Sequence, residues 1–507
     1  MRKRHRLFAK KKNNPYLCTQ IIYISQAISM IFNSFQFLWV CPLLFGTYYL
    51  ILSLKNRSKH THRLENLFLI VVSYLLYMQW KPIYALVLLG ITAITYFTAI
   101  HIENTGIQKR KKCLLVAGIS LSILPLLAFK YLNFLNEIIT SFLHLAGIDL
   151  QLPGLNRVLP LGISFYTLQA IGYLYDVYKE RIEAERYWWD YMLFVCFFPQ
   201  IVAGPINKAA KLLPQIKAQR SFSYEQVAEG CRWLLWGMFL KVVMADRVGL
   251  QANTILNSYE YLSGFTCLKG TLLYAFQIYG DFAGYSFMAL GVGKIFGFEL
   301  MNNFNRPYFS QSITEFWHRW HISLSTWLKD YIYIPLGGSR CSRIRNYWNI
   351  IVTFVVSGIW HGANWTFIIW GLIHGGLQVV EKALGLQGQS NKGIVKVVRI
   401  LCVFVAINIA WIFFRMPSVE DALMMIRKIV LCSPGTTVYI SPAKLLLVYL
   451  GIGMTVLNDV IDEINSKNLT LLSNRHGSVR WISYILLLVL ILSCGVFDTS
   501  QFIYAKF

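Results

Sequence analysis

Apolar runs close to the roughly 20 residues that a lipid bilayer requires recur along this whole chain. Hydrophobic residues fill 56% of its 507 positions and charged residues only 14%, against about 45–50% and about 25% in soluble globular proteins. We therefore predict an all-α, polytopic membrane protein of about eleven spans. The candidate spans are 35–54, 66–80, 82–102, 113–130, 159–178, 229–246, 268–292, 349–371, 397–415, 442–460 and 479–498.

Two further segments do not read as simple spans. Residues 188–206 are apolar but contain Pro199, Gly204 and Pro205, so we expect a bent or re-entrant segment buried in protein. Residues 303–336 are expected to form amphipathic helical pieces at the membrane interface. Without an internal repeat or a linker, the simplest organisation is one membrane domain over residues 30–507.

Residues 1–29 stand apart from this pattern. They begin with MRKRHRLFAKKK, and a natural first span with its own start follows at Met30. We interpret residues 1–29 as a basic N-terminal extension with a mis-assigned start. A signal peptide is the alternative, because a short apolar core follows the basic stretch.

Basic clusters between the spans set the expected orientation. The formal net charge is +24, and cytoplasmic loops of membrane proteins carry an excess of Lys and Arg. We therefore predict a multi-pass protein of the cell (inner) membrane whose basic loops contact anionic lipid, and no nucleic-acid partner. The clusters predicted to face the cytoplasm are 55–63, 109–112, 179–186, 208–220 and 340–345.

The sequence does not favour a metal site. The ten cysteines form no CxxC pair, and most lie in apolar runs where Cys acts as a small hydrophobic residue. His318 and His321 share a helical face, but no third ligand has suitable spacing for a zinc site. We interpret His318 as a solvated interfacial residue.

His361 is the strongest candidate for chemistry. It lies in the apolar run 349–371, and an ionisable residue inside a span is a functional hypothesis by default. Gly358 and Gly362 would allow close approach, while Trp360 would supply an apolar wall and Asn364 a hydrogen bond. A buried neutral imidazole can deprotonate a hydroxyl. The structural alternative is a histidine that caps a helix–helix contact.

Other polar residues could support His361. His321, preceded by Trp320 and followed by Ser323, is expected to lie opposite it as a second polar group. Asp281 lies in a span and needs a partner, either Lys294 or a tyrosine, or else it orients a catalytic histidine. His374, roughly 20 Å further along if the helix is continuous, is expected to be structural.

No GxSxG elbow accompanies these residues. Without a nucleophilic serine or cysteine beside a base, a covalent acyl-enzyme is not supported. Direct acyl transfer assisted by histidine fits the residues better.

Five ordered blocks resemble the membrane-bound O-acyltransferase family, in particular its bacterial branch with the alginate O-acetylases. They are LPLGISFYTLQAIGYLYDVYKER, FFPQIVAGPINKAAKLLPQI, QIYGDFAGYSFMALGVGKIFGF, FWHRWHISLSTWLKDYIYIPLGGSR and SGIWHGANW. The resemblance runs from Met30 to the C-terminal FDTSQFIYAKF. One departure is Lys208, where relatives commonly carry Arg after AGPI, because an ammonium lacks the planar fork of a guanidinium.

The resemblance implies a helical fold with a central tunnel, and it places the family's buried histidine at His361 and its second active-site histidine at His321. It implies an acyl thioester donor such as acetyl-CoA on the cytoplasmic side, without a tightly bound cofactor. The acceptor would be an extracytoplasmic glycan, reached through an SGNH-like partner protein. The alternatives are peptidoglycan acetylation, D-alanyl transfer to teichoic acid, and a non-enzymatic polysaccharide or acyl transporter.

Overall fold

Nearly all regular structure in this protein is helical, because a helix satisfies its own backbone hydrogen bonds where water is absent. The computed structural model describes residues 35–53, 61–148, 159–388, 392–497 and 503. Within these ranges no strand occurs, and only two isolated β-bridges join Leu262 to Thr436 and Phe304 to Trp320. The predicted all-α class is confirmed.

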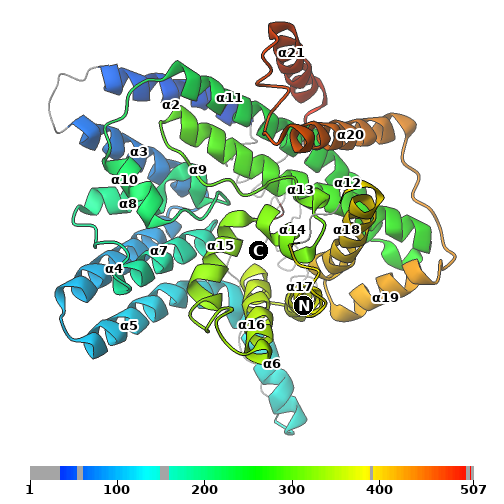
Figure 1. The fold of residues 1–507 in the computed structure, drawn as a ribbon, viewed down its shortest axis with the longest axis horizontal. Coiled ribbons are helices and arrows are strands. Elements are labelled where there is room, and N and C mark those ends of the chain that lie inside the picture. Colours follow the sequence, from blue (N-terminus) through cyan, green and yellow to red (C-terminus); the bar gives the residue numbers. More distant parts are fainter. Residues whose placement is uncertain (1–34, 54–60, 149–158, 389–391, 498–502, 504–507) are drawn as a thin grey trace, which may run out of the picture.

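The helices are named in chain order, with π- and 3₁₀-helical turns as η (Figure 1). They are α2 (Phe35–Ser53), α3 (Thr61–Met78), α4 (Tyr84–Asn104), α5 (Gln108–Leu126), η1 (Leu127–Tyr131), α6 (Leu132–Leu145), α7 (Ile163–Tyr178), α8 (Trp188–Cys196), α9 (Phe198–Ile201), α10 (Ala209–Lys217), α11 (Tyr224–Met238), η2 (Phe239–Ala245), α12 (Asp246–Leu256), η3 (Tyr259–Tyr261), α13 (Gly264–Ile295), η4 (Pro307–Phe309), α14 (Ile313–Arg319), α15 (Ile322–Leu328), η5 (Lys329–Tyr333), α16 (Arg343–His361), α17 (Trp365–Ala383), α18 (Gly393–Arg415), α19 (Val419–Val430), α20 (Pro442–Asn465) and α21 (Gly477–Cys494).

Five helices in the described ranges are long and apolar enough to cross a membrane: α4, the continuous stretch Gln108–Leu145, α18, α20 and α21. The stretch Gln108–Leu145 joins α5, η1 and α6 over 38 residues, so it continues well past the predicted span 113–130. The protein is a multi-pass membrane protein, and the number of about eleven crossings stays a prediction.

The predicted single span 349–371 is wrong. The chain leaves α16 at His361 and starts α17 at Trp365, where the Asn364 side chain accepts a hydrogen bond from Thr366 N at 3.0 Å. Asn is among the strongest helix N-caps because its side-chain oxygen satisfies an otherwise unpaired backbone N–H. An average of hydropathy over the run cannot detect this local break.

Glycines hold α16 and α17 together as an antiparallel hairpin. A Cβ atom at Gly358 would lie 2.2 Å from the carbonyl oxygen of Phe367, and one at Gly371 would lie 2.3 Å from that of Phe354. Only glycine permits such a close backbone approach. The small-residue notch expected beside His361 is therefore confirmed, but it packs two helices of one hairpin.

Short helices fill the centre of the molecule. Figure 1 places α14 and α15 between α13, α7 and the α16–α17 hairpin. The segment with α8 and α9 is bent at Phe197 and buried from Asp190 to Ile201, which confirms the expected bent segment. Residues 303–336 form the expected helical pieces, α14, α15 and η5.

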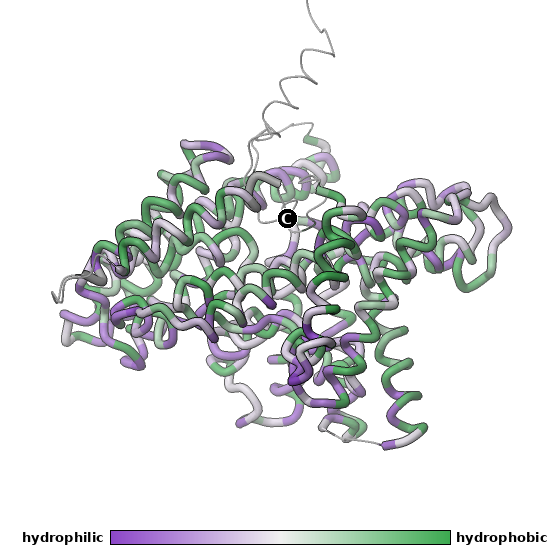
Figure 2. Tube along the Cα trace, turned by 90° about the horizontal axis from the view of Figure 1, so that it is seen from above, coloured by the Kyte–Doolittle hydropathy of each residue, from purple (hydrophilic) through white to green (hydrophobic). Residues whose placement is uncertain are grey.

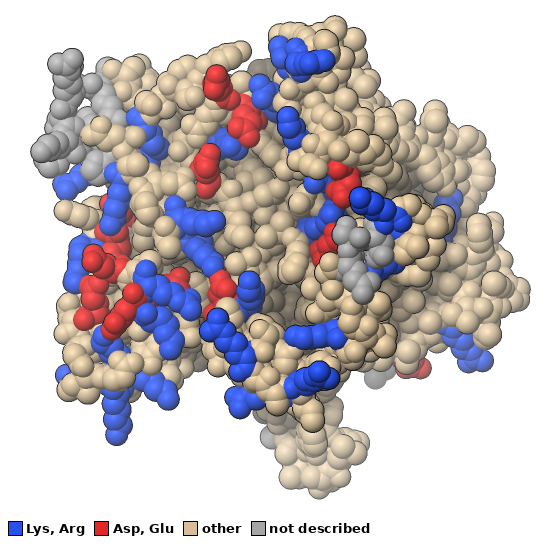
Figure 3. Space-filling model, viewed as in Figure 1, with Lys and Arg blue, Asp and Glu red and all other residues tan. Residues whose placement is uncertain are grey.

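Charged side chains gather on one face, the face toward the viewer in Figure 3, and hydrophilic residues follow the corresponding edge in Figure 2. Ion pairs join residues of the basic clusters to one another. Lys111 meets Glu180 at 2.6 Å, and Lys217 meets Glu185 at 2.6 Å. Lys208 forms an ion pair with Asp330. We refer to this surface as the basic face, and it fits the predicted cytoplasmic side.

Candidate active site

His361 is the last residue of α16, at the helix end remote from the basic residues Arg343 and Arg345. Its side chain is buried, and Nδ1 lies 2.7 Å from the carbonyl oxygen of Ser357, one turn earlier. A carbonyl can only accept, so Nδ1 carries the proton in this hydrogen bond. In the neutral ring the other nitrogen, Nε2, then carries the lone pair that a general base uses.

His321 lies at the break between α14 and α15 in a left-handed backbone conformation, with φ of 43°. Two backbone hydrogen bonds fix this break, from Asn305 N to Arg319 O at 2.9 Å and from Ile322 N to Asn303 O at 3.1 Å. A left-handed residue other than glycine costs energy and persists only where its surroundings enforce it. Such strain concentrates at functional sites, which favours a functional role for His321.

Trp360 lies between the two histidines. Its ring centroid is 5.9 Å from that of His321 and 4.9 Å from that of His361. Phe282 of α13 covers His321 edge-on, with centroids 4.6 Å apart. Both predicted catalytic histidines are therefore brought together in one buried aromatic site, as the sequence predicted for His321.

The same site extends to His374. Trp370 of α17 lies 4.8 Å from His361 and 4.8 Å from His374, measured between ring centroids. Trp317 of α14 donates its indole N–H to His374 Nδ1 at 3.2 Å. The separation of roughly 20 Å expected along a continuous helix is wrong, because the hairpin folds α17 back beside α16.

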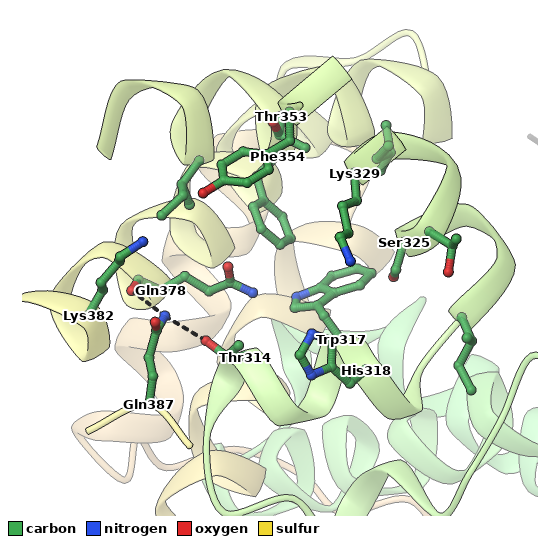
Figure 4. Close-up of a pocket in the computed structure, with 15 residues that line it drawn as sticks. Thr314, Trp317, His318, Ser325, Lys329, Thr353, Phe354, Gln378, Lys382 and Gln387 are labelled. Carbon is green, nitrogen blue, oxygen red and sulfur yellow. Dashed lines mark hydrogen bonds between the residues drawn. The ribbon is translucent and has the colours of Figure 1, made fainter. Parts of the chain in front are cut away.

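A pocket of about 500 Å³ leads toward these rings (Figure 4). Lys329 and Lys382 supply positive charge at its walls, and Lys329 and Gln378 point inward. Trp317 lines the pocket and contacts His374, and Trp370 contacts both His374 and His361, so these rings connect the pocket wall to His361. His318, predicted to be a solvated interfacial residue, is exposed and lines the same pocket.

Other predicted supporting residues make structural contacts. Ser323 Oγ accepts a hydrogen bond from Ile206 N at 3.0 Å, which ties α15 to the segment after α9. Asn364 caps α17 and donates to Pro417 O at 2.8 Å. Trp320 is buried behind His321, with its ring 5.1 Å from Trp411. These residues shape the site without presenting a reactive group to it.

Asp281 has a partner that the sequence did not suggest. Its Oδ1 accepts from Lys241 Nζ at 2.5 Å, and its Oδ2 accepts from Ile503 N at 2.8 Å. Lys241 also meets Asp246 at 2.6 Å. The expected partner Lys294 instead meets Glu229 at 3.1 Å. Because both oxygens of Asp281 are used here, the contacts favour the structural role over the orienting role.

Lys130 is a polar residue of the site that the sequence reasoning missed. Its ammonium on η1 donates to the carbonyl oxygen of Trp360 at 2.5 Å. The signal was present, because this lysine ends the predicted apolar span 113–130, where an ionisable residue is a functional hypothesis. Among the described residues, no group of three His, Cys, Asp or Glu side chains forms a metal-binding cluster.

Comparisons with known proteins identify a family model and several relatives that match this chain. A model of the membrane-bound O-acyltransferase family matches residues 24–416. The probable alginate O-acetylase of Pseudomonas aeruginosa is 39% identical over 403 residues, which cover 78% of this chain and 74% of that protein. The peptidoglycan O-acetyltransferase of Helicobacter pylori is 35% identical over 442 residues, 82% of each chain. The teichoic acid D-alanyltransferase of Streptococcus thermophilus is 29% identical over 246 residues, 46% of this chain and 59% of that protein.

Proposed function

Because this chain belongs to the membrane-bound O-acyltransferase family, we propose that it moves an acetyl group from a cytoplasmic thioester toward the hydroxyls of an extracytoplasmic glycan. It is a membrane acyltransferase by family. The O-acetyl group is favoured because the alginate and peptidoglycan O-acetyltransferases match about four fifths of the chain. The D-alanyltransferase match covers less than half of it.

The observation that carries the mechanism is the hydrogen bond from His361 Nδ1 to Ser357 O. It fixes the tautomer in which Nε2 can take the proton of an acceptor hydroxyl. His321, on the other side of Trp360, would position or polarise the reacting groups. The hydroxyl oxygen then attacks the thioester carbonyl carbon directly, without an acyl-enzyme.

The pocket at the basic face suits the donor. A coenzyme A thioester carries phosphates on a long, thin arm, and Lys329 and Lys382 would pair with those phosphates. The arm would pass Trp317 toward His361. On the outer side, an SGNH-like partner would supply the acceptor hydroxyl, carry the acetyl group as an ester and transfer it to a glycan hydroxyl. This partner is an inference from the family resemblance alone.

Ester content of the cell-surface glycan, measured by mass spectrometry, tests the proposal. His361→Ala should lower O-acetylation by about 10²–10⁴-fold, the usual contribution of a general base. His101→Ala is the matched control, because His101 Nδ1 also bonds a carbonyl one turn earlier, Phe97 O at 2.7 Å, but on an exposed surface. Full acetylation in a stably expressed His361→Ala variant would overturn the assignment.

The donor is tested separately. Inverted membrane vesicles from the native host would receive radiolabelled acetyl-CoA, or a carrier protein loaded with D-alanine. Label entering the glycan from acetyl-CoA alone supports the O-acetyl proposal. Label entering from the carrier protein alone would replace it with aminoacyl transfer, the rival that the third relative suggests.

A further inference from the structure

Lys130 lies on the π-helical turn η1, halfway along the stretch Gln108–Leu145. Its ammonium donates to Trp360 O at 2.5 Å and lies 3.5 Å from Ser164 Oγ. Trp360 O belongs to the peptide group that joins Trp360 to His361, so the positive charge lies beside the base. The side chain of Lys130 is partly buried.

Closing the end of α16 does not by itself require a charged group. The last carbonyls of a helix have no partner within it, and Tyr131 satisfies one of them with a neutral hydroxyl, which donates to Ile359 O at 2.7 Å. Consecutive residues of η1 thus bind consecutive carbonyls of α16. Within an apolar membrane stretch an ammonium is far costlier than a hydroxyl, even when it is only partly buried. The charge of Lys130 is therefore not explained by the helix-end hydrogen bond alone.

No carboxylate offsets this charge in the part of the chain that the structure describes: the two oxygens that accept from Lys130 are a carbonyl and a hydroxyl. An ammonium has three N–H donors. The third can therefore serve a ligand oxygen, and a full positive charge suits an oxygen that becomes negative. The Trp360 ring, 5.7 Å from the ammonium, gives it a favourable apolar wall.

We propose that Lys130 stabilises the negative charge that develops on the carbonyl oxygen of the acyl donor during transfer. This inference rests on the proposed acyl transfer. As the acceptor oxygen bonds to the thioester carbon, its proton passes to His361 Nε2, and the carbonyl electron pair moves onto the oxygen held by Lys130. The carbonyl then reforms, the carbon–sulfur bond breaks, and the leaving sulfur takes the proton from His361.

The structure also explains how the position of the Lys130 ammonium is fixed before the reaction. The ammonium is fixed by a backbone carbonyl and not by a mobile side chain, and the π-helical turn places two adjacent residues on one helix end. Donors fixed in advance at a developing oxyanion cost no reorganisation during the reaction. Loss of one such donor typically slows an enzyme by about 10²–10³-fold.

Three variants of the full-length protein test the proposal: Lys130→Met, Lys130→Arg and the matched control Tyr131→Phe, which removes the neighbouring helix-end bond without changing charge. The readouts are kcat and the KM for radiolabelled acetyl-CoA in inverted vesicles, ester content of the glycan in cells, and the melting temperature of the purified protein. Glycan esters report transfer whichever thioester is the donor.

Lys130→Met should lower kcat by about 10²–10³-fold with little change in KM, Lys130→Arg should recover part of the loss, and Tyr131→Phe should stay within about threefold of the wild type. An equal loss of kcat in Lys130→Met and Tyr131→Phe would show that Lys130 only stabilises the end of α16, and it would overturn the proposal. Normal esters in Lys130→Met, alongside lost esters in His361→Ala, would overturn it while the proposed function stands. Normal esters in both variants would overturn the proposed function itself.

Discussion

Two polar regions inside this protein differ in whether their charged groups have partners of opposite charge. In the Lys241 cluster (Lys241, Asp246 and Asp281), an ammonium lies between two carboxylates at 2.6 and 2.5 Å, so opposite charges compensate one another. At the His361 site, a neutral imidazole lies beside the ammonium of Lys130, which binds only a carbonyl and a hydroxyl among the described residues. Compensated charge stabilises a fold, whereas uncompensated charge can act on a substrate.

The comparison also concerns geometry. The Lys241 cluster joins three segments, η2, α12 and α13, and its Asp281 binds the backbone of Ile503 near the C-terminus. The His361 site is built where helices break, at the α14–α15 junction and at the turn between α16 and α17. Broken helices leave backbone groups that can position side chains, and continuous helices do not.

The largest expected effect on stability comes from Lys241→Met. It would leave two buried carboxylates without their cation, and removal of one partner from a buried ion pair costs about 3–5 kcal/mol. The free energy of unfolding should fall by that amount, measured by denaturation of the purified protein in detergent. Activity per folded molecule should stay near the wild-type value.

Lys294→Met is the control for this variant. Lys294 lies on α13 like Asp281, but its partner Glu229 is 45% exposed, and exposed pairs contribute only about 0–1 kcal/mol. Equal losses in the two variants would show that burial does not distinguish the Lys241 cluster from a surface pair.

His321→Asn should affect activity and leave the fold intact. Asn adopts the left-handed conformation more readily than other side chains except glycine, so the backbone at φ 43° should be retained while the imidazole is lost. We expect acetyl transfer to fall about 10²-fold with a melting temperature close to that of the wild type. A normal transfer rate would show that His321 has a structural role and takes no part in acyl transfer.

Gly358→Ala tests whether the close hairpin is needed. The new Cβ would lie 2.2 Å from Phe367 O, so α16 and α17 must separate, at a cost of about 1–3 kcal/mol. Movement of His361 with its helix end should also lower transfer. Gly376→Ala, on the same hairpin with nothing within 4 Å of the new Cβ, should instead stabilise the protein by about 0.5–1 kcal/mol. The measurements are the unfolding curve and the acetyl-transfer rate of each variant. Equal stability and equal transfer in Gly358→Ala and Gly376→Ala would show that the close hairpin is not needed.

The sequence could predict the helical membrane fold because it depends on local signals. Local signals also selected His361 and His321 as candidates, and their catalytic role stays a prediction. Long apolar runs are visible in composition, and His361 is conspicuous as an ionisable residue among apolar neighbours. The helical face predicted to hold both His318 and His321 is wrong, because α14 ends at Arg319 and His321 lies at the break before α15. The structure nevertheless brings His321 next to Trp360.

The remaining features depend on contacts between distant segments. Lys241 and Asp281 are forty positions apart, and nothing in either run indicates their pairing. The fold of α17 back onto α16 follows from Gly362 and Asn364, whose effect disappears in an average over an apolar run. Lys130 alone could have been found, since the rule that selected His361 applies to it as well.

Asn364→Ala is expected to have a small effect, and it distinguishes a supporting role from a catalytic role at the His361 site. The variant removes the cap of α17 and the bond to Pro417 O, which should cost about 0.5–2 kcal/mol of stability. The catalytic rate of the folded protein should remain within about threefold of the wild type, because Asn364 presents no group to the reacting atoms. A large fall in kcat at unchanged stability would contradict this, and it would mean that the turn between α16 and α17 carries a reactive group and not only the His361 helix end.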